Sequence, residues 1–295
     1  MESRFGRLIT AMITPFTPDG ALDLDGAVVL ASWLVEQGND GLVLAGTTGE
    51  SPTLTHDEQI ALVEAVSGAV DCHVIAGAGS NDTAAAVELT RRCSAAGADA
   101  ILTVTPYYNR PSQLGLFNHF RSVAEATDLP VMLYDIPPRS GRKIHTDTIL
   151  RLADEVPNIV AVKDAAGDVA ETARLVAASP AGFEVYSGED SLTLALLAVG
   201  VVGAVSVASH WATPETVVMM DAFFSGDVAA ATEANRRLIP SWDFESGDLT
   251  PNPIPSKAMM KVLGMPGGDC RPPMGPEPAD LADRARLVLA GLGRA

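Results

Sequence analysis

The sequence contains few cysteines and few basic residues. Its three cysteines, Cys72, Cys93 and Cys270, are widely spaced and form no C-x-x-C pair, which argues against a disulfide framework and against a zinc site. Lysine and arginine total 20 against 37 aspartates and glutamates, so the formal net charge is -17 at pH 7. This acidity argues against nucleic acid or an anionic membrane surface as a partner.

Long apolar runs are also missing. No run approaches the ~18 residues of a membrane span. Residues 1–7 lead into a short strand-like run, and not into the apolar core of about 7 to 15 residues that a signal peptide contains. We therefore expect a cytoplasmic protein. Since 47% of its 295 residues are hydrophobic, the chain can bury a large core, as one α/β barrel or as two ordinary domains.

Two kinds of segment alternate along most of the chain: short apolar runs typical of buried strands, and longer runs with apolar residues at helical spacing. The predicted strands are 8–14, 41–46, 73–77, 100–105, 130–134, 159–163, 183–187 and 203–207. The predicted helices are 24–37, 57–70, 83–96, 113–126, 146–153, 169–178, 191–199 and 214–224. Strand–helix units repeated in this order predict a closed parallel (β/α)8 barrel, the TIM-barrel fold of the α/β class.

An open doubly wound sheet is the alternative fold. It is expected to carry a glycine-rich dinucleotide turn after the first strand, and residues 13–18 contain no glycine. Beyond residue 225 the strand-like runs end, and residues 227–294 are predicted to be helical with a proline-rich break at 250–255. We expect a catalytic barrel at 1–225 and a C-terminal helical extension at 226–295 packed on it.

The most informative residue is Lys163, which ends the apolar run at residues 159–162. Such a run indicates a strand buried on both faces, and barrel enzymes carry their reactive groups at the carboxyl ends of strands. Desolvation there favours the neutral amine, a nucleophile that condenses with ketones. The alternative is a strand-end lysine whose ammonium reaches solvent.

The other predicted strand ends supply hydroxyls and one guanidinium, with neither histidine nor cysteine. These segments are 46–50, 105–109, 134–141 and 187–190. Together with one lysine, they favour amine catalysis, in which hydroxyls move protons and backbone N–H groups of a glycine-flanked loop hold a carboxylate.

Other chemistries lack the residues that they need. The five histidines are scattered singly and no H-E-x-x-H motif occurs, so no metal site is predicted. The chain has no G-x-S-x-G nucleophile motif, and the pair Gly77 and Gly79 is too little to indicate a phosphate-binding loop. We expect neither a metal nor a cofactor.

The polar residues at the strand ends also have structural alternatives. Thr47 and Thr48 could cap a turn. Tyr107 and Tyr108 could lie at an interface, and Arg139 could be a solvated loop charge.

Taken together, the motifs resemble the dihydrodipicolinate synthase family of the Schiff-base aldolase superfamily, which also contains N-acetylneuraminate lyase. The resemblance extends from about residue 7 to about residue 290. The motifs that carry it are 46–51, 103–111, 133–141, 162–163 and 251–255.

The resemblance implies that pyruvate condenses with L-aspartate-4-semialdehyde through a Schiff base on Lys163, giving 4-hydroxy-tetrahydrodipicolinate. It implies that Tyr134 donates and accepts protons, and that Thr47 links it to Tyr108 of a neighbouring subunit. A homo-oligomer of at least two chains follows, and a dimer of dimers is usual in this family.

The resemblance also implies binding roles. Thr48 and the backbone at Val205 would contact pyruvate, Gly188 would contact the second substrate, and Arg139 would bind the semialdehyde carboxylate. Two alternatives stay open. One is an aldolase of the same superfamily acting on a 2-keto-3-deoxy sugar acid, and the other is a non-catalytic paralogue that binds a ligand.

One departure from the family concerns regulation. In members inhibited by lysine, the amino acid binds at the tight dimer interface. Here Gln59 and Ala85 stand where those members have a histidine and a glutamate, so we predict weak or absent inhibition. The matching allosteric positions are Ser51, His56, Asn81 and Tyr107. A second departure is Asp135, where relatives commonly have asparagine, and the sequence gives no account of its effect.

Overall fold

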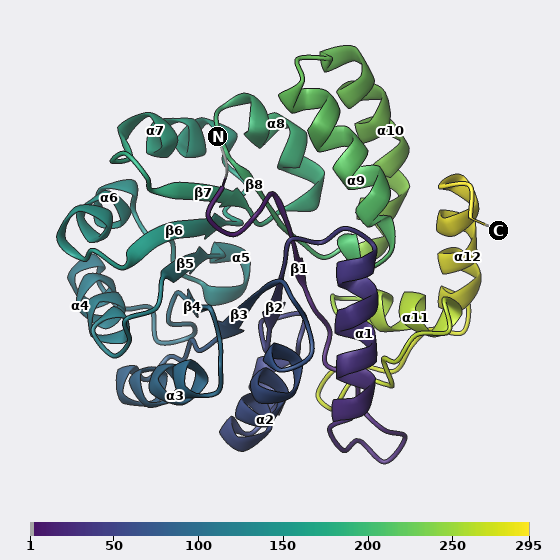
Figure 1. Cartoon of the computed structure of the whole chain (residues 1–295), viewed down its shortest axis with the longest axis horizontal. Coiled ribbons are helices and arrows are strands. Elements are labelled where there is room, and N and C mark those ends of the chain that lie inside the picture. Colours follow the sequence, from purple (N-terminus) through teal and green to yellow (C-terminus); the bar gives the residue numbers. More distant parts are fainter. Residues whose placement is uncertain (1–2, 295) are drawn as a thin grey trace.

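The computed structural model describes residues 3–294 and contains one closed barrel of parallel strands (Figure 1). Each strand pairs with the next along the chain, and β1 pairs with β8 to close the barrel. This confirms the predicted (β/α)8 fold and excludes the open sheet. The strands are β1 Leu8–Ala11, β2 Gly41–Leu44, β3 His73–Gly77, β4 Ala100–Val104, β5 Val131–Asp135, β6 Ile159–Asp164, β7 Glu184–Ser187 and β8 Gly203–Ser206.

Helices surround the barrel, and α10 packs along α9 beyond its rim (Figure 1). The barrel helices are α1 Leu24–Glu36, α2 His56–Ser67, α3 Thr83–Ala95, α4 Gln113–Ala124, α6 Thr146–Glu155, α7 Val169–Ala178, α8 Thr193–Ala198 and α9 Ser209–Phe224. Short helical turns are η1 Ser51–Thr53, α5 Pro137–Ser140 and η2 Asp190–Leu192. The C-terminal helices are α10 Val228–Glu245, α11 Ile254–Val262 and α12 Leu281–Gly291.

Side-chain caps begin several of these helices. The Thr55 hydroxyl accepts a hydrogen bond from Glu58 N at 3.2 Å, and the Glu58 carboxylate accepts one from Thr55 N at 2.8 Å. These reciprocal bonds form a capping box at the start of α2. Asp23 and Ser112 cap α1 and α4 with one bond each.

Several predicted boundaries were wrong. The first strand ends at Ala11 and does not reach residue 14. The helix predicted at 191–199 is η2 followed by α8, and α9 begins five residues before the predicted position 214. The short helix α5 was not predicted, because it lies in a segment with prolines. Residues 263–280 are not helical, since glycines and prolines recur through them.

The barrel core has an inner and an outer layer, because alternate side chains of each strand point to opposite sides. The inner layer includes Ile9, Val43, Met132, Tyr134 and Val205. Neighbouring residues along the same strands join the larger cluster between strands and helices. Within the described residues, no helix is both long and apolar enough to cross a membrane.

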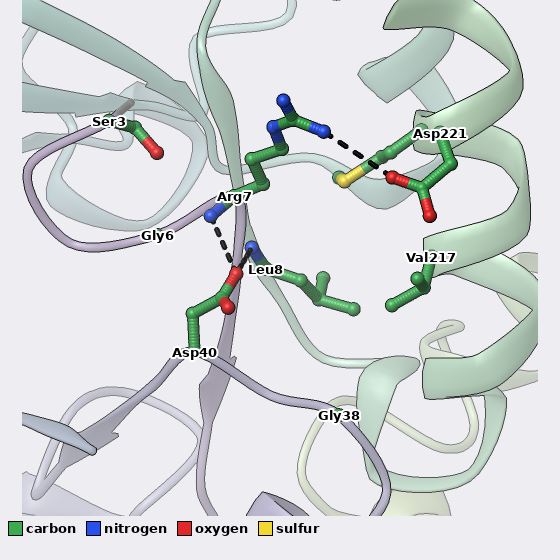
Figure 2. Close-up of a pocket in the computed structure, with 9 residues that line it drawn as sticks. Ser3, Gly6, Arg7, Leu8, Gly38, Asp40, Val217 and Asp221 are labelled. Carbon is green, nitrogen blue, oxygen red and sulfur yellow. Dashed lines mark hydrogen bonds and ion pairs between the residues drawn. The ribbon is translucent and has the colours of Figure 1, made fainter. Parts of the chain in front are cut away.

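A cavity of about 340 Å³ lies where the chain enters β1 (Figure 2). There the Asp40 carboxylate accepts hydrogen bonds from Arg7 N at 2.7 Å and Leu8 N at 3.0 Å, and Arg7 pairs with Asp221 at 3.3 Å. This is the amino-terminal end of the barrel, where residues serve stability and not catalysis. The candidate active site lies at the opposite end.

Candidate active site

Lys163 lies inside the barrel near the carboxyl end of β6. It lies two residues after Ala161 on the same strand, so its side chain points to the same side as that of Ala161, which belongs to the inner layer. The residue is only 5% exposed. Among residues 3–294, no carboxylate lies within ion-pairing distance of its amine. Its Nζ is 4.4 Å from the centre of the Tyr134 ring. A buried amine without a counter-ion is therefore present where the sequence predicts it.

Tyr134 is a hydroxyl-bearing neighbour of this amine. It stands on β5 directly beside Lys163 in the β5–β6 register, and it is 5% exposed. A small cavity of about 30 Å³ is lined by Tyr134, Thr47 and Ser51 together with glycines of the β3 end. The structure brings Tyr134 and Thr47 to one cavity, but it contains no direct hydrogen bond between these two side chains within the described chain.

Thr47 also lines a second, larger cavity of about 220 Å³. Arg139, Tyr107 and Ile136 contribute to the walls of this cavity. Thr47 therefore lies between the Tyr134 side of the site and the Arg139 side.

Thr48 and Arg139 are joined by one residue that sequence reasoning did not assign a role. Asn252, which is buried, donates from Nδ2 to the Thr48 hydroxyl at 2.8 Å, and its carbonyl accepts a bond from Arg139 at 3.4 Å. Arg139 lies on α5 and is otherwise exposed. Asn252 belongs to one of the motifs of the resemblance, and that is the signal from which its importance could have been inferred.

Gly188 and Val205 complete the predicted substrate contacts. Val205 is buried on β8, paired with Ile9 of β1. Gly188 follows β7, and its N–H donates to Asp164 O at 2.8 Å. A β-carbon at Gly188 would come within 2.9 Å of Lys163 Cγ and Cε, so the glycine leaves the space that the lysine stem occupies.

Replacing Gly188 with alanine is therefore expected to displace Lys163 while the barrel stays folded. The new methyl group would overlap the lysine stem, and a misplacement of this kind costs about 100-fold in rate. We expect kcat/KM to fall by about that factor in a steady-state assay with pyruvate. The matched control is Gly275→Ala, because Gly275 has open space at the β-carbon position and should tolerate alanine. Equal activity of both variants would contradict the assignment.

The remaining predicted catalytic residue, Tyr108, does not join this site within one chain. It is 90% exposed, has a left-handed backbone with φ 74°, and its N–H donates to Ser140 O at 3.3 Å. Tyr107 beside it is 36% exposed. Two exposed tyrosines on one loop form a surface suited to contact with another chain.

The predicted allosteric positions lie near this loop in two connected pairs. Gln59 is buried, and its Nε2 donates to Ser51 O at 3.2 Å while its Oε1 has no partner among the described residues. Asn81 donates from Nδ2 to Tyr107 O at 3.2 Å. The other two positions have no such link within residues 3–294: His56 is exposed at the start of α2 and Ala85 is half-buried on α3.

A second amine reaches the strand ends, which corrects the expectation of a single one. Lys143 pairs with the Asp135 carboxylate at the end of β5, and Ile144 N donates to the same carboxylate at 3.0 Å. Burial raises the pKa of Asp135, although the Lys143 ammonium acts against that rise. Aspartate at this position therefore has a partner that fixes it.

Histidine is also present just beyond the strand ends, but it is enclosed. His210 follows β8, accepts a bond from Ile13 N at 3.0 Å on Nε2, and has its Nδ1 2.8 Å from Val207 O. Burial lowers the pKa of His210 to about 4. Within residues 3–294, no group of three or more His, Cys, Asp or Glu side chains is arranged to hold a metal ion.

A buried pair of carboxyl groups lies behind β8. Asp190 accepts bonds from Val207 N at 2.7 Å and Ala208 N at 2.9 Å, and Glu245 at the end of α10 lies beside Asp190. Burial, with the charges of Asp190 and Glu189, raises the pKa of Glu245 well above its ordinary value of 4.5. Glu245 therefore keeps its proton at pH values where an exposed glutamate has lost it.

This pair predicts a pH dependence of stability. Above pH 4.5 the unfolded chain loses the Glu245 proton and the folded chain keeps it, so the free energy of unfolding falls as pH rises, by up to about 1.4 kcal/mol per pH unit. Glu245→Gln cannot ionise and places a neutral amide beside Asp190. We expect it to unfold less readily than the wild type at pH 8, with a gap that widens from pH 5 in denaturant titrations.

The matched control for that prediction is Asp243→Asn, an exposed carboxyl on the same helix. The free energy of unfolding of this variant should differ from that of the wild type by the same amount at every pH. A Glu245→Gln variant that is less stable than the wild type at every pH would show that the ionised carboxylate is the required form.

Comparisons with known proteins place these features in context. The model of the Dihydrodipicolinate synthetase family matches residues 4–289. A 4-hydroxy-tetrahydrodipicolinate synthase from Moorella thermoacetica is 52% identical over 92% of this chain and 92% of its own length. One from Acidothermus cellulolyticus is 49% identical over 98% of this chain and 93% of its own.

Solved structures of dihydrodipicolinate synthases have the same fold as this chain. A dihydrodipicolinate synthase from Cyanidioschyzon merolae with lysine bound superposes with a TM-score of 0.96 at 42% identity, covering 100% of both chains. One from Bacillus anthracis gives 0.94 at 41% identity and covers 98% of each chain.

Proposed function

This chain belongs to the dihydrodipicolinate synthetase family, and we propose that its reaction proceeds through a Schiff base on Lys163. It is a lyase that condenses pyruvate with L-aspartate-4-semialdehyde to give 4-hydroxy-tetrahydrodipicolinate, a step of lysine and diaminopimelate biosynthesis. The observation that carries the mechanism is the buried Lys163 amine, which has no carboxylate partner among residues 3–294 and lies 4.4 Å from the Tyr134 ring. No metal or cofactor takes part in the proposal.

The chemistry follows from the two side chains on β5 and β6. The neutral Lys163 amine adds to the pyruvate ketone, and loss of water gives the imine. Tyr134 moves protons at this centre, and removal of a methyl proton gives the enamine that attacks the aldehyde. The substrate amine then closes the ring and releases Lys163. Thr47, between the two cavities, extends the proton path toward the mouth of the site.

The substrate ends have separate binding groups. Thr48 and the backbone at Val205 hold the pyruvate end, and Gly188 leaves room beside the lysine. Arg139 binds the semialdehyde carboxylate, because its planar guanidinium suits a carboxylate and it lines the larger cavity.

Borohydride trapping tests the proposal. Reduction in the presence of pyruvate should fix a pyruvate-sized adduct on Lys163, located by intact mass and peptide mapping. The free enzyme would then be assayed with aspartate semialdehyde and with 2-keto-3-deoxy sugar acids. The trapped enzyme, whose lysine is blocked, serves as the inactive comparison. Turnover of a sugar acid in place of the semialdehyde would reassign the acceptor. A folded protein without adduct would overturn the mechanism and favour a binding paralogue.

We also propose a homo-oligomer of at least two chains, assembled as a dimer of dimers in the cytoplasm. Tyr108 and Tyr107 are exposed beside the site, and Leu114 nearby is 62% exposed. Apolar and aromatic side chains of this kind are enriched at interfaces. In this arrangement Tyr108 of one chain completes the site of its partner.

We also propose that the chain divides into a catalytic barrel at 1–225 and a C-terminal helical extension at 226–295. The extension supports the active site, because Asn252 bridges Thr48 and Arg139. A chain cut at residue 225 would lose that bridge.

Lysine is expected to inhibit this enzyme weakly. Gln59 and Ala85 provide no carboxylate for a lysine ammonium, and such a lost partner costs on the order of 1–3 kcal/mol, or roughly 10- to 100-fold in affinity. Activity titrated with lysine should be less than half inhibited at about 1 mM. Gln59→His with Ala85→Glu should increase the sensitivity. Half-inhibition of the unmodified enzyme well below that concentration would refute the prediction.

A further inference from the structure

The loop at residues 46–50 carries Thr47 and Thr48, and its conformation is not one that the chain adopts readily. Glu50 has a left-handed backbone with φ 58°, which is unfavourable for a residue with a side chain. Internal bonds close the turn: Glu50 N donates to Thr47 O at 3.1 Å and Ser51 N to Gly46 O at 3.1 Å. Contacts from outside the loop must hold it in place.

One of these outside contacts is a buried ion pair. Glu50 and Lys257 each have side chains that are 2% exposed, and Glu50 Oε1 lies 2.6 Å from Lys257 Nζ. The second oxygen of the carboxylate accepts a bond from Arg271 N at 2.9 Å. Both oxygens of Glu50 are therefore held by the C-terminal extension.

Lys257 also has contacts that hold its side chain in place. It lies on α11, donates to Asp269 O at 3.1 Å, and places Nζ 4.0 Å from the centre of the Phe16 ring. The Arg271 guanidinium lies 4.2 Å from the same ring and pairs with Glu58 of α2 at 2.6 Å. An ammonium buried in this way stays charged only beside a carboxylate, and burial does lower the pKa of Lys257 while Glu50 opposes that shift.

The same segment also reaches the other functional residue of the loop. Asn252, five residues before Lys257, donates to the Thr48 hydroxyl at 2.8 Å. One segment of the extension thus contacts the loop at Thr48 and at Glu50, on either side of Gly49. Gly49 O in turn accepts a bond from Thr14 at 2.6 Å.

We propose that Lys257, paired with Glu50, is a positioning residue that holds the 46–50 loop in the conformation that binds the keto-acid carboxylate. Neither residue touches substrate in this proposal. The inference rests on the proposed function, since it assigns that loop to pyruvate. It adds that the affinity for pyruvate depends on an ion pair whose members are 207 positions apart in the sequence.

The test is the double variant Lys257→Met/Glu50→Gln, with each single variant beside it. Removing one member leaves a buried charge without a partner, whereas removing both charges is far less harmful to stability. The double variant should therefore melt closer to the wild type than either single variant does. Its KM for pyruvate should still rise about 10-fold, with a smaller change in kcat, because the loop has lost its anchor.

The control is Arg236→Met/Glu233→Gln, which removes an exposed ion pair of 2.6 Å on α10 and should leave both constants unchanged. A folded double variant whose KM for pyruvate matches the wild type would overturn the proposal. If the double variant does not fold, Glu50→Asp carries the same test, because it keeps both charges but draws the carboxylate away from Lys257, together with amide hydrogen exchange of residues 46–51. Faster exchange there supports the proposal, and unchanged exchange with unchanged KM overturns it.

Borohydride trapping of the wild type separates this test from that of the proposed function. Without a pyruvate adduct on the wild-type enzyme, the Schiff-base mechanism itself fails. With an adduct on the wild type, and equal pyruvate concentrations for half-maximal trapping in the wild type and the double variant, only the positioning role fails.

Discussion

Replacing Lys163 with arginine is expected to lower kcat by about 10⁴-fold or more and to abolish borohydride trapping of pyruvate. Arginine keeps the positive charge and much of the stem, but its guanidinium does not give up its proton and forms no imine. The substitution therefore removes the nucleophile and little else. Steady-state assay and intact mass after reduction measure the two effects independently.

Two other lysines supply the controls for this experiment. Lys143, paired with Asp135, lies at the same end of the barrel, and Lys261 is exposed at a distance from the site. Lys143→Arg and Lys261→Arg should both still form the pyruvate adduct. If the Lys163→Arg variant were trapped as fully as the wild type, the reacting amine would be another lysine, and peptide mapping would identify it.

The sequence predicted the barrel because its strands are buried on both faces. A strand in that environment is a continuous apolar run, and such a run is visible without knowledge of its neighbours. Lys163 could be predicted for the same reason, since a lysine that ends such a run must either be buried or extend its ammonium to solvent. The capping box at Thr55 and Glu58 is equally local, because its two residues are three positions apart in the chain.

What escaped prediction depends on residues far apart in the chain. Asn252 meets Thr48 across 204 positions, and Lys257 meets Glu50 across 207. Neither residue belongs to a periodic pattern that indicates its partner. Glu245 at the end of α10 reads from the sequence as an ordinary polar residue, and only the packing of α10 on η2 buries it beside Asp190. The sequence therefore predicts only a C-terminal extension packed on the barrel. In the structure, residues of this extension contact the loop that carries Thr48 and Glu50.

Mixing two inactive variants is expected to restore activity, if Tyr108 acts in the partner's site. Tyr108→Phe removes the hydroxyl of a residue that is 90% exposed in its own chain, and loss of the proton relay should cost about 100-fold or more. Lys163→Arg is inactive for a different reason. In a mixed dimer, one site has both defects and the other has an intact Lys163 and an intact Tyr108 from its partner.

Equal amounts that assort at random form half of their dimers as mixed dimers, each with one intact site, so activity should reach about a quarter of the wild-type value. Co-expression of the two variants, followed by assay of the pooled protein, measures it. If Tyr108 instead acted within its own chain, each site of a mixed dimer would lack one residue, and activity would stay at the level of the parents. Full activity of Tyr108→Phe alone would show that its hydroxyl has no part in the reaction. Recovery requires that the exposed loop of one chain enters the site of another, because no arrangement within a single chain gives an intact Lys163 and an intact Tyr108 together.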